Sequence, residues 1–443
     1  MIIYKMEYSN DIKIHELEPL YYSASNRAEW RLSSDKLYTN TIRLLNVGVT
    51  KSADQNNLNK LAGAAGCINS ITILDGNVEI QSLTRANEWA AIKHSFKSNS
   101  YNEDLGSVLN LTRKSAHFNL ADRTDAQDVD RCVGSKVVEG TLRTALSATN
   151  TTERLTAKGQ LDLSDYMGFL QSVNYLDTSL MKDLKIVIEY NMDALAIMFG
   201  NQTTGNLAST RPLLVVEEIV DPTIVSANMG KSQVINYKVI ENDIVTVPAI
   251  VATAGDPNPV QPKTYHLHAY NNKSVDRMLI KSRTTLGSTE NTSGTNVMYG
   301  LYNSQAMLKQ KNQVRVNGMN VFARDGITSE NERLAHVADT WAPNMSIMPF
   351  QQGLAFKAPD AVSRDNIINM GNEAIGSQSY FACDLAGQKV KDLQIDYERV
   401  GFFNATAAQL SLCKYNSAVD LIIFAEVKKA VVFSGGSYNI VYV

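Results

Sequence analysis

The sequence has few of the residues that build metal sites, disulfide frameworks or secretory leaders. Its 443 residues include four cysteines, which are widely spaced at Cys67, Cys132, Cys383 and Cys413. None forms a CxxC pair or a cysteine–histidine cluster with zinc spacing. We therefore expect buried free thiols and a chain made in a reducing, cytosol-like compartment. The first residues lack the apolar stretch of a signal peptide, and no run approaches the roughly 18 apolar residues that span a bilayer.

Positive charge is also in short supply. The chain carries 42 basic and 45 acidic residues, for a formal net charge of −3. Proteins that coat nucleic acid usually have a basic excess or a basic arm. The first twenty residues instead hold two lysines against four acidic residues. The charge pattern therefore predicts no direct, specific binding of nucleic acid.

Catalytic motifs are missing as well. The sequence has no GxSxG elbow, phosphate-binding glycine loop, HExxH or EF-hand pattern. His266 and His268 would share one face of a strand, but no carboxylate or cysteine lies near them in sequence, so partly exposed strand histidines are the favoured interpretation. The pair Glu217–Glu218 has no evident acid/base partner, and Gly63-Ala-Ala-Gly66 fits a turn. We predict no catalytic, cofactor-binding or metal-binding residues, no cofactor, and no enzyme activity.

Strand patterns dominate what is present. Short β-branched or aromatic runs are bounded by Gly, Asn, Asp and Pro, and several alternate apolar with polar residues. The clearest runs cover residues 41–49, 68–74, 184–190, 213–219, 234–240, 265–270, 421–427 and 430–433. Asp75-Gly76 between two such runs predicts a hairpin with a type I′ turn. Helical spacing appears only over 163–173, after a possible cap at Asp162 or Ser164, and over 331–338.

Long polar stretches separate these elements, at 98–131, 145–160 and 283–297. Connections of that length are unusual in a compact domain unless they have a function. A mostly-β chain with such loops is typical of a sandwich or jelly roll.

The sequence also predicts a tandem repeat. The segment Ile68–Gly76 has a counterpart in Val316–Gly326, and each half then reaches a tryptophan, Trp89 or Trp341. The apolar runs starting at Leu184 and Leu421 form a second matching pair. Offsets near half the chain length favour two copies of one β-domain, although chance likeness between strand-turn-strand units remains an alternative.

Three segments carry a family resemblance. Leu61–Gly76, Leu161–Tyr190 and Leu385–Val400 resemble, in that order, parts of the double jelly-roll major capsid proteins of icosahedral double-stranded DNA viruses, of the virophage and polinton-like virus type. In that family the second segment is a short helix in a long loop before the closing strand of the first jelly roll. The third is similar to the family's late strands.

The resemblance implies an all-β fold of two tandem eight-stranded jelly rolls with long loops and a few short helices. The division expected is an N-terminal arm at 1–35, a first jelly roll at 36–225 and a second at 226–443. It further implies a major capsid protein of the virion shell that forms pseudo-hexagonal homotrimeric capsomers. Assembly would take place in the host cytoplasm or nucleus, and penton proteins, minor capsid proteins and an internal membrane are the further partners to consider.

Two terminal segments have hypothetical roles. Residues 1–35 are expected at the base of the shell, in contact with neighbouring subunits. The apolar strand after Ser434-Gly-Gly-Ser437 should pair either within its own jelly roll or with a neighbour, because a free strand edge aggregates. The alternatives to a major capsid protein are another virion protein, such as a spike or penton, and a β-sandwich carbohydrate-binding protein or enzyme.

Overall fold

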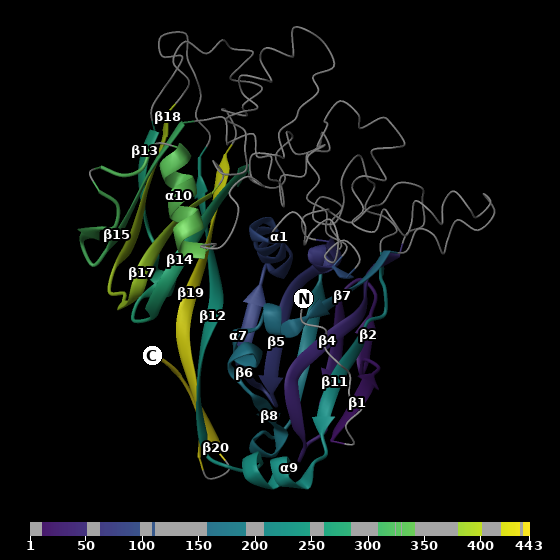
Figure 1. Cartoon of the computed structure of the whole chain (residues 1–443). Helices are drawn as coiled ribbons and strands as arrows, with labels where there is room; N and C mark the ends of the chain where they lie inside the picture. The colour runs from purple at the N-terminus through teal and green to yellow at the C-terminus, as the bar shows by residue number, and fades with distance from the viewer. Residues whose placement is uncertain are drawn as a thin grey trace, which may run out of the picture.

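The structure is a computed structural model in which two β-domains stand side by side (Figure 1). It describes residues 11–50, 63–97, 109–110, 157–191, 208–248, 261–284, 309–323, 325–328, 330–341, 380–400, 418–434 and 437–443. The predicted loops 98–131, 145–160 and 283–297 lie largely outside these ranges. Among the described residues, no helix is long and apolar enough to cross a membrane.

The first half of the chain forms two antiparallel sheets. One sheet has the order β1-β11-β4. Strand β10 pairs with the end of β4 on the same edge as β11, and β7 and β8 pair with the other edge of β4. The second sheet has the order β2-β3-β9-β5-β6. Their strands are β1 (Ile12–Leu17), β2 (Tyr21–Ser23), β3 (Arg27–Arg31), β4 (Leu37–Thr50), β5 (Ile68–Asp75), β6 (Val78–Thr84), β7 (Ala157–Asp162), β8 (Tyr175–Asp177), β9 (Leu184–Tyr190), β10 (Ala208–Ser209) and β11 (Leu213–Ile219).

The second half also forms two antiparallel sheets. Their orders are β12-β19-β14-β17, with β20 added to β19, and β13-β18-β15-β16. The strands are β12 (Gln233–Val247), β13 (Gln261–His266), β14 (Ser274–Thr284), β15 (Lys309–Val316), β16 (Met319–Asn320), β17 (Tyr380–Lys389), β18 (Leu393–Val400), β19 (Val419–Ser434) and β20 (Ser437–Tyr442).

The strand orders show that the two halves repeat one topology. The run β3-β9-β5-β6 corresponds to β13-β18-β15-β16, and β1-β11-β4 with β7 and β8 corresponds to β12-β19-β14-β17. Each half therefore has the eight strand positions and two facing sheets of a jelly roll, with β7 and β8 sharing one position and with β2, β10 and β20 as additional strands. The predicted fold class is confirmed: the chain is a double jelly roll.

The pairing of repeated segments by sequence was wrong in detail. The strand at Leu184, β9, matches β18 and not the strand at Leu421, which belongs to β19 and matches β11. The closing strand of the first roll is thus β11. Residues 421–427 and 430–433 also belong to one 16-residue strand rather than two. Only the first two residues of the run 265–270 are strand.

The helices are short and few among the described residues. They are η1 (Gly63–Cys67), α1 (Ala86–Phe96), η3 (Leu163–Asp165), α7 (Gly168–Ser172), η4 (Thr178–Leu180), α9 (Pro222–Asn228), η6 (His268–Tyr270) and α10 (Glu330–Trp341). The helix predicted over 163–173 is broken into η3 and α7, with Asp162 as the cap, since its carboxylate accepts from the Ser164 amide at 3.0 Å. The helix predicted over 331–338 is confirmed as α10.

The turn types of two hairpins follow from the residues at their central positions. The hairpin predicted at Asp75-Gly76 is present, but its loop residues are Gly76 and Asn77, and only Gly76 has positive φ (61°). That pattern belongs to a type II′ turn, in which the first of the two central residues has positive φ and is usually glycine. The predicted type I′ turn was therefore wrong. The type I′ pattern occurs instead at Asn317 and Gly318 between β15 and β16, with φ of 53° and 82°.

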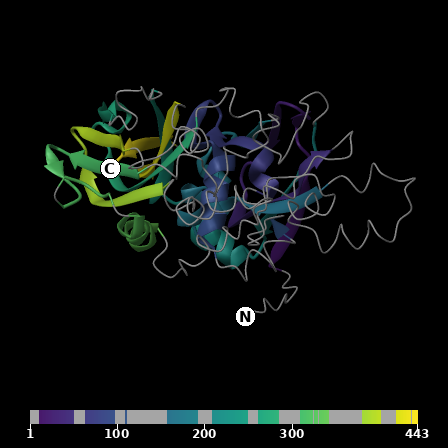
Figure 2. The ribbon, with the colours of Figure 1, turned by 90° about the horizontal axis from the view of Figure 1, so that it is seen from above.

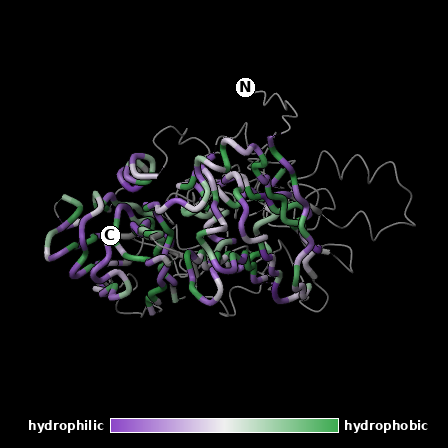
Figure 3. Tube along the Cα trace, turned by 90° about the horizontal axis from the view of Figure 1, so that it is seen from below, coloured by the Kyte–Doolittle hydropathy of each residue, from purple (hydrophilic) through white to green (hydrophobic). Residues whose placement is uncertain are grey.

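The core lies between the sheets of each roll. Apolar and polar segments alternate along the chain in both rolls (Figure 3). Strands β5 and β9 sit centrally in their sheet and are buried at most positions, as expected for strands covered by a facing sheet. The apolar runs at 68–74 and 184–190 therefore mark the centre of this sheet.

The separate N-terminal arm predicted at 1–35 is not present in the part of it that is described. Strand β1 pairs with β11 and β3 pairs with β9, so residues 12–31 complete both sheets of the first roll. The predicted boundary at 225/226 falls within α9, which connects β11 to β12.

Candidate assembly surfaces

The two rolls meet where α7 of the first lies against β12 of the second. A Cβ at Gly168 would stand 2.9 Å from the carbonyl carbon of Lys238 and closer still to its oxygen, so only glycine fits this approach. The next residue, Phe169, stacks edge-to-face on Tyr237 with ring centroids 5.5 Å apart. The Phe169 amide also donates to the Gln81 side chain at 2.8 Å. Helix α7 is therefore held by its own roll and packed against the other.

Strand β6 of the first roll runs beside β12 in the same junction. The Tyr237 hydroxyl donates to the carbonyl oxygen of Ile80 at 2.8 Å. The side-chain amide of Asn242 donates to the carbonyl and hydroxyl oxygens of Thr84 at 2.9 and 2.6 Å. Two edge strands from different rolls are thus joined through side chains rather than through a continuous ladder.

An aromatic cluster closes the upper part of the junction. The Trp89 ring of α1 lies 5.3 Å from Trp341 of α10, edge-to-face at 73°, and 5.3 Å from Phe424 of β19. Trp341 donates from Nε1 to the Met278 carbonyl at 3.1 Å, and the Arg277 guanidinium stands 4.1 Å from its ring. Seen from above, α1 lies between the rolls and α10 on the flank of the second (Figure 2). The two tryptophans singled out by the repeat are therefore in direct contact.

The linker between the rolls is anchored at both ends. Asp221 caps α9 by accepting from the Thr223 amide at 2.7 Å. After the helix, the Gly230 amide donates to Asp177 of the first roll at 2.6 Å. The linker follows the base of the molecule (Figure 1) and is bonded to the first roll there.

Strand β20 pairs with β19 of its own chain, along the part of β19 that β14 leaves free. The Tyr442 hydroxyl donates to Glu241 at 2.9 Å, and the Lys429 ammonium lies 4.7 Å from the Tyr442 ring. Burial and the nearby Asp75 carboxylate of the first roll raise the pKa of Tyr438. Pairing within its own roll, one of the two predicted alternatives, is the one present, and β20 also reaches the first roll.

The far edge of the first roll exposes several large apolar side chains. Strand β1 ends one sheet and β2 ends the other. Ile14 is 54% exposed and Leu20 is 71% exposed, and Ile12 and Tyr21 are exposed beside them. Such an edge is an aggregation hazard unless something covers it.

Beneath this edge, a triad of polar side chains fixes β1 to its sheet. Glu218 of β11 bonds His15 of β1 at 2.6 Å and the Lys36 ammonium at 2.6 Å. Burial would raise the pKa of Glu218, but the bonds from Lys36 and His15 outweigh it and lower that pKa. Glu217 faces the opposite side of the strand, where Thr39 donates to it at 3.2 Å. No acid/base partner for this pair was evident from the sequence, but in the structure Glu218 pairs with His15 and Lys36 from other strands and turns, and Glu217 accepts from Thr39.

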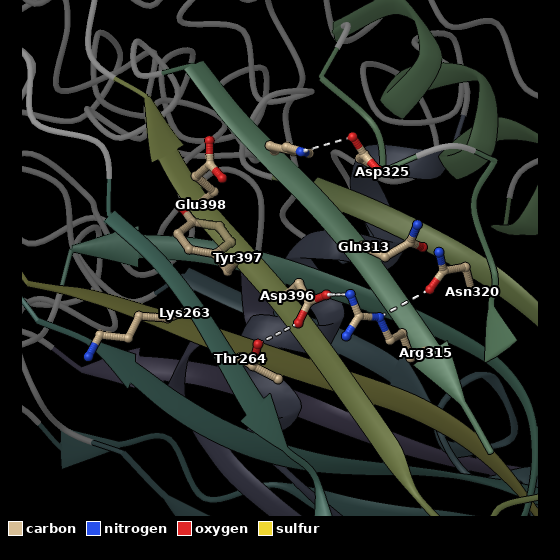
Figure 4. A pocket seen from close by; sticks show the side chains of 10 residues that line it. Lys263, Thr264, Gln313, Arg315, Asn320, Asp325, Asp396, Tyr397 and Glu398 are labelled. Atoms are coloured by element: carbon tan, nitrogen blue, oxygen red, sulfur yellow. Dashed lines mark hydrogen bonds and ion pairs between the residues drawn. The ribbon is translucent and has the colours of Figure 1, made fainter. Parts of the chain in front are cut away.

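The outer face of the second roll carries a polar hollow of about 480 Å³ over β13, β18 and β15 (Figure 4). Asp396 lies at its centre, accepting from Thr264 at 2.6 Å and pairing with Arg315 at 2.7 Å. Arg315 also donates to Asn320 of β16 at 3.1 Å. Three basic and three acidic residues line the hollow, and most of them pair with each other: Lys263, Lys311, Arg315, Asp325, Asp396 and Glu398.

The remaining residues singled out by sequence lie apart from any common site. His266 and His268 are exposed and their rings stack 5.9 Å apart, with His266 3.4 Å from Asp392. Within the described ranges, no three His, Cys, Asp or Glu side chains cluster as metal ligands would. Cys67 and Cys383 are buried free thiols, and burial raises the pKa of each to about 12. Cys132 and Cys413 lie outside the described residues.

Sequence comparison identifies no relative: no family model matches the chain, and no curated protein matches it. Structural comparison places the double jelly roll among viral capsid folds. A chain from the Sputnik virophage has a TM-score of 0.58 at 12% identity, covering 98% of this chain and 88% of that one. For the mavirus major capsid protein, the TM-score is 0.54 at 11% sequence identity, covering 97% of this chain and 90% of that one. For the PBCV-1 virus capsid, the TM-score is 0.52 at 10% sequence identity, covering 98% of this chain and 97% of that one. The fold is thus that of double jelly-roll major capsid proteins, over almost the whole length of both chains.

Proposed function

We propose that this chain is a major capsid protein, which self-assembles into pseudo-hexagonal homotrimeric capsomers that tile an icosahedral shell. The observation that carries the proposal is the repeated strand order of two rolls joined by a packed junction. Three such subunits around a threefold axis present six similar lobes, and six similar lobes can tile a flat face. The structural neighbours named for their capsids support the same role.

The described surfaces support a structural, self-assembling protein better than an enzyme. Most of the charges in the polar hollow of the second roll are paired, and a group of exposed apolar side chains lies along the β1 and β2 edge of the first roll. A spike or penton is less well supported, because nothing in such a role calls for the tandem repeat. A carbohydrate-binding protein would need exposed aromatic side chains beside a groove, which the hollow does not offer among its lining residues.

The finer partners belong to the same proposal. Penton and minor capsid proteins would contact the trimers in the shell, and an internal membrane would lie beneath it. The net charge of −3 favours an indirect contact with the genome, without specific nucleic-acid binding. The protein would act in the virion after assembly in the host cytoplasm or nucleus.

Electron microscopy of the purified full chain tests this function. Class averages with a hexagonal outline and six lobes, and sheets or shells of such particles at higher concentration, are the expected result. Two-lobed single subunits under every assembly condition would contradict it.

A further inference from the structure

The tip of the β15–β16 hairpin holds the only Asn–Gly pair in the sequence, Asn317-Gly318. Both residues are exposed, and both have positive φ, 53° and 82°. An asparagine followed by glycine is chemically labile, because glycine has no side chain to shield its amide nitrogen from the asparagine side chain before it. The hairpin therefore places a reactive pair where water has access to it.

The fold binds both polar atoms of the Asn317 side chain. Its Oδ1 accepts from the main-chain amides of Lys391 at 2.7 Å and Asp392 at 3.3 Å, and its Nδ2 donates to the carbonyl oxygen of Lys389 at 3.1 Å. The main-chain amide of Asn317 also donates to the Asp392 carbonyl at 2.8 Å. These partners form the turn between β17 and β18, which carries the chain from one sheet of the second roll to the other. Asn317 thus fastens this turn to the β15–β16 hairpin.

We propose that Asn317 is a site of spontaneous deamidation that the native fold holds back. In the reaction, the amide nitrogen of Gly318 attacks Cγ of Asn317, the Cγ–Nδ2 bond breaks, and ammonia leaves with the proton of the attacking amide. Water then opens the cyclic imide at either carbonyl carbon and gives aspartate or isoaspartate. The bonds to Lys389 and Lys391 hold both ends of the side-chain amide, so ring closure requires this corner of the roll to open first.

Deamidation makes that opening irreversible. An aspartate at position 317 has no hydrogen to donate to Lys389, so one of its oxygens faces the Lys389 carbonyl oxygen. An isoaspartate adds a carbon to the main chain inside a two-residue turn, and such a turn sets the register of its hairpin. The same hairpin carries Arg315 and Asn320, which line the polar hollow (Figure 4), so the shape of the hollow depends on this residue as well. The inference is independent of the capsomer function, and its readouts need no assembly.

Peptide mass mapping of the full-length chain tests the reaction. The chain is kept in mildly alkaline buffer made with heavy-oxygen water, either native or in guanidinium chloride, and the label gained at position 317 is followed with time. We expect conversion to be about tenfold or more faster in the denaturant, because the native rate is reduced to the fraction of time that the corner is open. Asn320, which precedes the β-branched Val321 in the same hairpin, is the internal control and should gain no label over the same period. Equal rates in the two buffers, or no conversion in the denaturant, would overturn the proposal.

Hydrogen exchange tests the consequence for the fold. Asn317→Asp and Asn320→Asp add the same charge to the same hairpin, but only the first removes a donated bond, since Asn320 accepts from Arg315 at 3.1 Å. We expect the amides of 316–320 and 389–393 to exchange about threefold or more faster in Asn317→Asp than in the parent, and at the parent's rate in Asn320→Asp. Unchanged exchange in Asn317→Asp, or an equal increase in both variants, would mean that the Asn317 bonds do not hold this corner, and the proposed protection would be wrong.

Discussion

Replacing Gly168 by alanine sets two physical effects against each other. Alanine is the better helix former, and the gain at this first position of α7 is at most about 1 kcal/mol. Against it, the new Cβ would lie 2.9 Å from the carbonyl carbon of Lys238 and nearer to its oxygen, below the 3.0 Å that Cβ atoms keep. Overpacking of this kind costs about 1–3 kcal/mol, and moving α7 away weakens the Phe169–Tyr237 contact by a further ~0.5–1.5 kcal/mol.

The packing cost therefore exceeds the helical gain. We expect Gly168→Ala to destabilise the protein by about 2 kcal/mol and to lower Tm by about 4–8 °C for a unit the size of one roll. Differential scanning calorimetry measures both, with Ser172→Ala on the same helix as the control, because its exposed side chain should change stability by less than about 0.5 kcal/mol. A Gly168→Ala protein as stable as the parent, or more stable, would refute the close approach of α7 to β12.

Three further results are expected. Trp89→Ala should cost about 3–5 kcal/mol in chemical unfolding, because it removes a buried indole that packs on both rolls; an unchanged midpoint would contradict the aromatic junction. Glu218 gives stability that is complete above its ordinary pKa of 4.5 and is lost as pH falls through its lowered folded pKa, since the Lys36 and His15 bonds outweigh burial. Acid titration of Glu218→Gln should therefore show a shallower loss of stability below pH 4.5 than the parent. Cys67 and Cys383, buried and with pKa values raised to about 12, should resist alkylation in the native protein and react after unfolding, as peptide mass mapping will show.

Much of the fold is visible in the sequence because its signals are local. Alternation and β-branched runs predicted the long central strands, among them β4, β5, β9, β11, β12 and β19, and the glycine at position 76 marked a hairpin. The register of that turn depends on how β5 and β6 pair, which is not a local property, so the turn type was wrong. The break between η3 and α7 likewise follows from the approach to β12, which helical spacing does not record.

The repeat was detectable, but its alignment was not. Strands β9 and β19 are both buried apolar runs, so the sequence gives no means of telling their different positions in the sheets. The sequence favours an arm at the N-terminus because β1 is half polar and its partner β11 lies about two hundred residues away, as the His15–Glu218 bond shows.

The junction residues had almost no signal of their own. Trp89 and Trp341 were noticed only as markers of the repeat, and their mutual contact could not be inferred from spacing. The sequence around Gly168, Tyr237 and Asn242 has no pattern that marks them as contact residues. Only the paired rolls give them a role, because contacts between domains depend on the final arrangement of both.

The solution mass of the purified full-length protein tests the central claim most directly. Light scattering coupled to size exclusion should give a stable particle of three times 48.8 kDa that persists on dilution. A single subunit of 48.8 kDa at all concentrations would contradict the assignment as a capsomer-forming capsid protein.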